Sequence, residues 1–170
     1  MCALKSLDMT CERVGLLRFK ILELDACIAL EHVVKVFPLM ELQTVPDAPG
    51  YVKGLMNLRG SSVPVLDLAE RLGIARPSVP YTIDTPILLC EAMNKRFGLI
   101  VDEVLGVVTA ERESFQLRSE FQDGVQFFTA VVNGGNNPAL LVDVERIAGK
   151  GFFVENAPLP VAVETLKGCL

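Results

Sequence analysis

Apolar residues recur in short runs along the chain, and Gly, Pro, Asn or Asp interrupt them every few residues. Short apolar runs between such turn signals are typical of β-strands. In the first part of the chain the runs lie at residues 14–22, 26–30, 33–37, 41–45, 55–59 and 63–66. In the second part they lie at residues 85–91, 96–101, 104–108, 127–132 and 139–142. The pattern therefore predicts a mainly β protein with a few short helices.

A hairpin that leads into a helix is predicted at residues 51–72, which read YVKGLMNLRGSSVPVLDLAERL. The two strands meet at a turn that contains Gly60. The two-residue period of a strand places Asn57 and Arg59 on one face of the first strand. Asp67 stands where a helix N-cap belongs, directly after the second strand.

Two stretches of the first half are similar to two stretches of the second half. Residues 27–34 resemble residues 97–105 with one insertion, and residues 65–72 resemble residues 141–147 with one deletion. This repeat predicts two similar small β-units, which pack together because each alone is too small to satisfy its apolar content. The predicted parts are an arm at residues 1–13, one domain at 14–147 with subdomains at about 14–73 and 85–147, and a tail at 148–170.

Charge and hydropathy narrow the classes of partner and compartment. The 170 residues carry a net charge of −5, and Lys and Arg are scattered, which argues against a nucleic-acid or anionic-membrane partner. Hydrophobic residues make up 51% of the chain, yet no apolar run approaches the roughly 20 residues that span a bilayer. The first residues mix charge into any apolar segment and do not resemble a secretory signal. We expect a cytoplasmic protein, not inserted in the membrane, whose partner is another protein.

The sequence offers few groups for catalysis or metal binding. His32 is the single histidine, and we expect it to lie exposed in a turn rather than to act as a base. The five cysteines show no metal-ligand spacing, so we expect free thiols. Cys27 and Cys90 lie in apolar strand patterns, where a small buried side chain is the better interpretation. The sequence thus predicts no enzyme, no cofactor and no metal site.

The hairpin region also resembles the signature of the CheW-like family, the coupling proteins of bacterial chemosensory arrays. The matching residues are Tyr51-Val52-Lys53-Gly54, Asn57-Leu58-Arg59-Gly60, Val63-Pro64-Val65 and Asp67-Leu68. The resemblance continues at residues 97–104 and 140–145, and it covers about residues 14–147. It implies two five-stranded SH3-like β-barrels packed together. It also implies a cytoplasmic adaptor at the inner face of the membrane, between the tips of methyl-accepting chemoreceptors and the regulatory domain of a CheA-type histidine kinase.

Six residues fall where the family resemblance implies a receptor-binding groove. They are Val33, Lys35, Val36, Gly54, Asn57 and Arg59. Core packing explains the two valines equally well, and a turn or bulge explains the glycine. A surface position on the strand, or a tie to a carboxylate such as Asp67, explains the arginine. Most family members carry a glutamate where this chain has Lys35. Because a reversed charge changes the choice of partner more than the fold, this lysine favours an accessory member of a divergent system, such as one that controls pili and twitching motility.

The resemblance also implies a kinase-binding surface on the second barrel, at exposed strand edges. The candidate residues are Ile87, Leu89, Leu99 and Val101. One alternate set of strand residues is expected to be core, and the sequence leaves open which set docks.

A second hypothesis is a stand-alone small-molecule sensor. Its ligand would occupy the groove between the barrels or an apolar site formed by Phe115, Phe121, Phe127 and Phe128. The alternative for these phenylalanines is core packing.

Overall fold

The computed structural model describes residues 12–78, 80–117, 127–134 and 136–149. The strands are β1 (Arg13–Ile21), β2 (Leu24–Ala29), β3 (Val33–Pro38), β4 (Val52–Leu58), β5 (Ser61–Asp67), β6 (Pro86–Ala92), β7 (Lys95–Ile100), β8 (Glu103–Glu111), β9 (Phe115–Gln116), β10 (Phe128–Val132) and β11 (Ala139–Val142). The helical elements are the 3-10 turns η1 (Leu30–His32) and η2 (Arg112–Ser114) and the short helices α1 (Leu68–Arg71) and α3 (Val144–Gly149). The prediction of a mainly β protein with few short helices is therefore confirmed.

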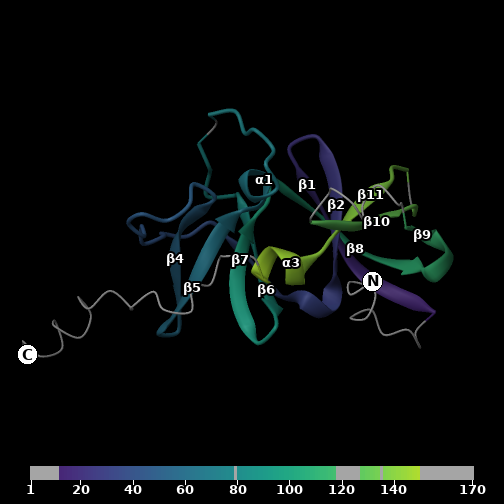
Figure 1. Cartoon of the computed structure of the whole chain (residues 1–170), viewed down its shortest axis with the longest axis horizontal. Helices are drawn as coiled ribbons and strands as arrows, with labels where there is room; N and C mark the ends of the chain where they lie inside the picture. The colour runs from purple at the N-terminus through teal and green to yellow at the C-terminus, as the bar shows by residue number, and fades with distance from the viewer. Residues whose placement is uncertain (1–11, 79, 118–126, 135, 150–170) are drawn as a thin grey trace, which may run out of the picture.

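The strands form two sheets that lie side by side (Figure 1). One sheet has six strands in the order β8-β1-β2-β11-β10-β9, and the other has five in the order β3-β6-β7-β5-β4. The two small barrels expected from the sequence are present, although one sheet has six strands rather than five.

The predicted division of the domain into subdomains at about 14–73 and 85–147 is wrong. Strands β1 and β2 come from the first half but pair with β8 and β11 of the second half. The five-stranded sheet uses the continuous segment from β3 to β7. One sheet is thus inserted between the strands of the other, and the internal repeat of the sequence does not mark their boundary. The predicted arm at 1–13 and tail at 148–170 lie almost wholly outside the described residues.

Two hairpin turns explain where the chain reverses in the five-stranded sheet. Between β4 and β5, Arg59 (φ 51°) and Gly60 (φ 86°) both have left-handed backbones, and the Asn57 side chain accepts a hydrogen bond from the Gly60 N–H at 2.9 Å. Between β6 and β7, Met93 and Asn94 have φ values of 50° and 58°. Two successive left-handed residues are typical of the tight turns that match strand twist. The predicted hairpin at residues 51–72 is confirmed.

The five-stranded sheet is closed by a contact between the chain after β3 and strand β4. Gln43 and Leu55 exchange two backbone hydrogen bonds of 2.8 Å, and this isolated bridge replaces the strand predicted at 41–45. Gly54 lies beside the bridge with φ 149°, and a Cβ atom there would stand 2.6 Å from the Gln43 carbonyl oxygen. Glycine at this position therefore permits the closure.

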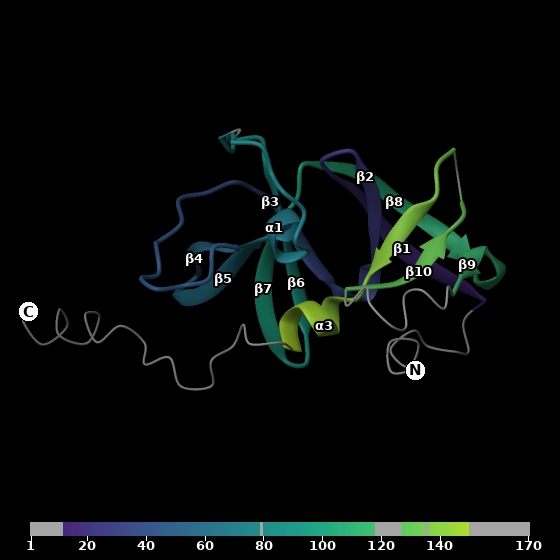
Figure 2. The ribbon, with the colours of Figure 1, turned by 45° about the horizontal axis from the view of Figure 1, so that its top comes forward.

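Buried side chains form three clusters, one inside each barrel and one between them. The shared core between the sheets takes residues from both, including Phe19 and Ile28 of the six-stranded sheet and Phe97 and Leu99 of the other. Both short helices contribute to it, with Leu68 from α1 among their buried residues. Helix α3 follows β11 of the six-stranded sheet but lies against β6 of the five-stranded one (Figure 2). The shared core makes the two barrels one body.

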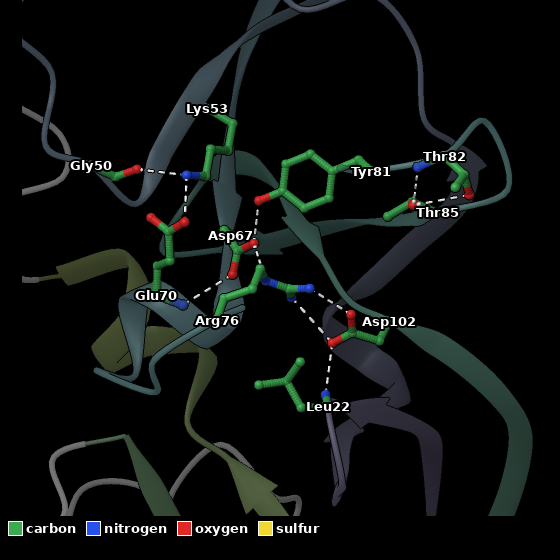
Figure 3. A network of polar contacts seen from close by, with 10 residues as sticks. All are labelled: Leu22, Gly50, Lys53, Asp67, Glu70, Arg76, Tyr81, Thr82, Thr85 and Asp102. Atoms are coloured by element: carbon green, nitrogen blue, oxygen red, sulfur yellow. Dashed lines mark hydrogen bonds and ion pairs between the residues drawn. The ribbon is translucent and has the colours of Figure 1, made fainter. Parts of the chain in front are cut away.

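A polar network reinforces this joint (Figure 3). Asp67, fully buried at the end of β5, caps α1 by accepting from the Glu70 N–H at 3.0 Å, as the sequence predicts. Arg76 reaches Asp67 at 2.9 Å and Asp102 at 2.6 Å. Asp102 also accepts from the backbone N–H of Leu22 in the β1–β2 turn at 2.7 Å. One arginine from the loop between α1 and β6 thereby ties the five-stranded sheet to the six-stranded one.

Candidate docking surfaces

Strand β3 is an edge strand whose two faces differ. Val33 lies opposite Cys90 and Val36 opposite Leu88, and both of these partners belong to the shared core. The two valines therefore lie on the shared-core face of the sheet, and Val36 is 40% exposed because no strand covers that edge. Lys35 lies on the other face of β3.

Strand β8 is the matching edge of the six-stranded sheet. Val107 lies opposite Leu17, a shared-core residue, yet its side chain is 60% exposed. On the same face, Leu30 of η1 covers Gly15, where a Cβ atom would stand 3.3 Å from the leucine side chain. We call Leu30, Val33, Val36 and Val107 the shared-core margin: apolar residues at which the core between the sheets reaches the surface.

Val107 and Leu30 were not among the predicted site residues. The strand prediction at 104–108 included Val107, but period 2 alone does not tell which face of an edge strand is open. Only the register with β1, fixed by residues far away in sequence, places Val107 beside the shared core. The predicted Val33 and Val36 do lie at this margin.

The other predicted groove residues divide into surface and structural positions. Asn57 and Arg59 are exposed at the tip of the β4–β5 hairpin, where the Asn57 side chain holds the turn. The explanation that tied Arg59 to Asp67 is wrong, since the buried carboxylate is bound by Arg76. Gly54 is buried against the chain's own Gln43, so its role is closure of the sheet rather than contact with a partner. Lys35 is exposed, with its Nζ 5.0 Å from the Phe37 ring centroid.

The predicted kinase-binding side chains are all buried, so this assignment is wrong. Ile87, Leu99 and Val101 are fully covered, and Leu89 is 4% exposed. Strands β6 and β7 lie inside the sheet rather than at its edge, and both of their faces pack. Ile87 and Leu89 fill the inside of the five-stranded barrel, whereas Leu99 and Val101 belong to the shared core. Neither alternate set is therefore available for docking.

The phenylalanines proposed for a ligand site pack within the protein where the structure describes them. Phe128 is buried in the shared core, and Phe127 packs against it with the Arg71 guanidinium 4.7 Å from its ring centroid. Phe115 packs against the interior of the six-stranded barrel. Phe121 lies outside the described residues.

His32 and the two central cysteines are each explained by their surroundings. The His32 side chain is only 15% exposed, and its Nδ1 lies 3.2 Å from the Glu91 carbonyl oxygen, so the expectation of an exposed histidine is wrong. Cys27 and Cys90 are fully buried, as predicted. Burial raises the pKa of each thiol to about 12, which keeps both thiols protonated at neutral pH.

No group of three or more His, Cys, Asp or Glu side chains in the described ranges is placed to hold a metal ion. Within those ranges, no helix has the length and apolar character needed to cross a membrane.

Comparisons with known proteins agree with this architecture. The chain matches the family described as "CheW-like domain" over residues 15–151. "Probable chemotaxis protein CheW" of Rhizobium etli is 29% identical over 134 residues, which are 78% of this chain and 85% of that protein. "Chemotaxis protein CheW" of Bacillus subtilis is 31% identical over 107 residues, 63% of this chain and 65% of that protein.

A solved structure shows the same fold. It is described as the scaffolding protein TtCheW from Thermoanaerobacter tengcongensis, and it superposes with a TM-score of 0.74 at 21% sequence identity. The superposition covers 82% of this chain and 94% of that structure. Because the family match spans most of the sequence and the fold agrees, this chain belongs to the CheW-like domain family.

Proposed function

We propose that this protein is a non-enzymatic adaptor that links the helical tip of a chemoreceptor to the regulatory domain of a CheA-type histidine kinase. Membership of the CheW-like family supports the adaptor class. The observation that carries the docking proposal is the shared-core margin, a set of apolar side chains left open along the edge strands β3 and β8 of a chain with a net charge of −5. Through the receptors, the adaptor would be held at the inner face of the membrane.

The shared-core margin suits one face of a helix. Val36 and Val107 are 40% and 60% exposed, and Leu30 is 38% exposed. Exposed apolar residues at the edge of a core are typical of binding sites, and an amphipathic helix presents an apolar stripe that can cover them. Arg59, exposed on the β4–β5 hairpin, offers a cation to an acidic residue of the same partner.

The proposed mechanism is positional. The shared core and the Arg76 network hold the two sheets as one rigid body, so a partner on one surface stays in register with a partner on another. A displacement of the receptor is then transmitted to the kinase without chemistry in the adaptor. Since the predicted kinase-binding side chains are buried, the kinase domain must meet residues outside that set.

Isothermal titration with two ligands tests this proposal. The ligands are the kinase regulatory domain and a receptor-tip fragment from the same organism. Val107→Lys places a charge in the shared-core margin, and Arg59→Glu reverses the charge at the tip of the β4–β5 hairpin. We expect each substitution to lower the affinity for the receptor fragment about tenfold or more, while the affinity for the kinase domain stays within a factor of two. Val45→Lys is the control, because Val45 is an exposed valine (38%) outside the margin.

Two results would contradict the proposal. If neither ligand binds the wild-type protein, the coupling role is wrong. If Val45→Lys lowers the affinity for the receptor fragment as much as Val107→Lys does, the shared-core margin is not the receptor surface.

Lys35 bears on which receptor is involved. It is exposed on β3 where most family members carry a glutamate, and this reversal supports a receptor of a divergent, pilus-type system. Titration of several receptor tips from the same organism, with wild type and Lys35→Glu, tests this part. We expect the substitution to change the order of preference among the tips, and an unchanged order would contradict it.

A further inference from the structure

The loop between β10 and β11 contains the single Asn-Gly pair of the chain, Asn133-Gly134. Both residues are exposed to solvent. The backbone nitrogen of a residue that follows asparagine can attack the asparagine side chain, and glycine has no Cβ atom to shield that nitrogen. The pair is therefore a candidate site for a covalent change of the chain that the adaptor role does not involve.

The surroundings of the other described asparagines disfavour the same reaction. The Asn57 side chain is held by a backbone N–H of its own hairpin turn, and a leucine follows it. Asn94 and Asn136 are each followed by a residue whose side chain shields the backbone nitrogen. Asn137 precedes a proline, which has no N–H proton to lose. Among the described asparagines, Asn133 alone is followed by glycine.

The hydrogen bonds that hold this loop leave the reacting groups open. The Asn133 N–H donates to the Ser114 carbonyl oxygen at 2.8 Å, and the Gly134 carbonyl oxygen accepts from Arg18 at 3.2 Å. Neither the Asn133 side chain nor the Gly134 N–H has a hydrogen-bond partner among the described residues. A Cβ atom at Gly134 would have nothing within 4 Å, so there is space for a ring to form here.

We propose that Asn133 is a site of spontaneous deamidation. Hydroxide takes the proton of the Gly134 N–H, and the nitrogen attacks the side-chain carbon Cγ of Asn133. The bond between Cγ and Nδ2 breaks, ammonia leaves with a proton from water, and a five-membered succinimide ring forms. Water then opens the ring at one of its two carbonyl groups, which gives either aspartate or isoaspartate. The net change consumes one water and releases one ammonia, and it needs no oxidant or reductant.

The two products act differently on the loop. Aspartate keeps the backbone and adds a negative charge near Arg18, which is bound to the next carbonyl group. Isoaspartate carries the main chain through the former side chain, which adds one carbon between residues 133 and 134. The longer chain displaces the Gly134 carbonyl oxygen from Arg18, whose other bond in the loop is to the Asn137 carbonyl oxygen at 3.1 Å. Isoaspartate thus loosens the β10–β11 loop from β1.

Incubation of the full chain in alkaline buffer, with a parallel sample in mildly acidic buffer, tests the site. Mass spectrometry of proteolytic peptides measures the conversion of each asparagine. We expect Asn133 to convert several times faster than Asn57 or Asn136, and faster in the alkaline buffer, because the attacking nitrogen must lose its proton.

Gly134→Val places a branched side chain beside the nitrogen without a clash, so we expect conversion of Asn133 to slow about tenfold or more. Gly50→Val is the matched control, since Gly50 is also exposed and follows a proline. We expect it to leave the conversion of Asn133 unchanged.

Urea unfolding measures the effect on the loop. Isoaspartate in the aged sample is counted with an isoaspartyl methyltransferase and a labelled methyl donor. We expect the aged protein to unfold at a lower urea concentration than fresh protein and than Asn133→Asp, which adds the charge alone.

Conversion of Asn133 no faster than that of Asn136, or an unchanged rate in Gly134→Val, would overturn the proposed site. Equal unfolding midpoints of the aged protein and Asn133→Asp would overturn the loosening of the loop. None of these results depends on the kinase or the receptor, so failure here is distinct from failure of the adaptor role.

Discussion

Gly54 shows how one residue allows the five-stranded sheet to close. Its backbone lies in a region that favours glycine, and the carbonyl oxygen of Gln43 occupies the place of a side chain. Sequence alone leaves a bulge, a turn or a partner contact open at this position. The structure places Gly54 at a bulge in the β4–β5 pairing, as one of these alternatives has it, and the Gln43–Leu55 bridge beside it joins residues of different segments.

We predict that Gly54→Ala destabilises the protein by more than about 2 kcal/mol, because backbone strain adds to the clash with Gln43. Gly60→Ala is the control. Gly60 also has a left-handed backbone, but its Cβ position is open space, so we expect a loss of about 1 kcal/mol. Urea unfolding followed by circular dichroism measures both. Equal losses would show that the approach of Gln43 is unimportant.

Tyr81 provides a test by pH. Burial and its hydrogen bond to Asp67 raise the pKa of the Tyr81 hydroxyl above its ordinary value of about 10. A raised pKa means that the stabilisation is complete below pH 10 and is lost as the pH rises above 10. We predict that wild type exceeds Tyr81→Phe in unfolding free energy at pH 8 and loses about 1 kcal/mol of this advantage at pH 11. Urea unfolding at the two pH values checks this, and an advantage that is constant or grows would contradict it.

The burial of single residues could be predicted where the apolar pattern of the neighbouring sequence indicated it. Cys27, Cys90 and the Asp67 cap follow from strand and helix patterns near them. The prediction of the four kinase-binding residues was wrong because the two-residue period of a strand identifies a buried and an exposed face only in a sheet that has solvent on one side. Strands β6 and β7 pack on both faces, and in such strands apolar residues run on without alternation.

At the scale of elements, the loop between α1 and β6 anchors the joint between the two sheets. Arg76 crosses between two carboxylates, and Tyr81 donates to one of them (Figure 3). Which side chains such a loop anchors depends on where Asp67 and Asp102 lie in space, and a single sequence does not carry that information.

We predict that Arg76→Gln destabilises the protein by about 3 kcal/mol, because it leaves the buried Asp67 carboxylate without its cation. Arg96→Gln is the matched control. The ion pair of Arg96 with Glu91 is shorter, 2.6 Å against 2.9 Å for Arg76 and Asp67, but its side chains are 60% and 43% exposed, so we expect a loss below about 1 kcal/mol. Urea denaturation measures both losses from the shift in midpoint, provided that the dependence of the unfolding free energy on urea concentration is unchanged. Similar losses in the two variants would contradict a special role for the Arg76 network.

At the scale of the whole molecule, the repeat in the sequence predicts two β-units but not their strand membership. Similar halves suggest sequential barrels, whereas β1 and β2 pair with strands more than half the chain away. Strand pairing over such distances depends on the packing of the finished core. For the same reason the shared-core margin, which combines β3 and β8, was only half predicted.

We predict that fragments 14–73 and 85–147 do not fold separately, because each lacks strands of both sheets. Thermal melts of the fragments followed by circular dichroism should show no cooperative transition, whereas residues 12–149 should melt cooperatively. A mixture of the two fragments should recover strand signal if the core can assemble from separate chains. A cooperative melt of either fragment alone would contradict the interleaved arrangement.

The interleaved arrangement also sets an order for synthesis. The five-stranded sheet is complete in sequence once Ile100 has been made, but β2 finds its neighbour β11 only when Val142 has been made. Until then the apolar residues of β1 and β2, Phe19 among them, lack their cover. Long-range pairing of this kind is slow, and uncovered strands are prone to aggregate. We therefore expect the nascent chain to need most protection until Val142 has been made.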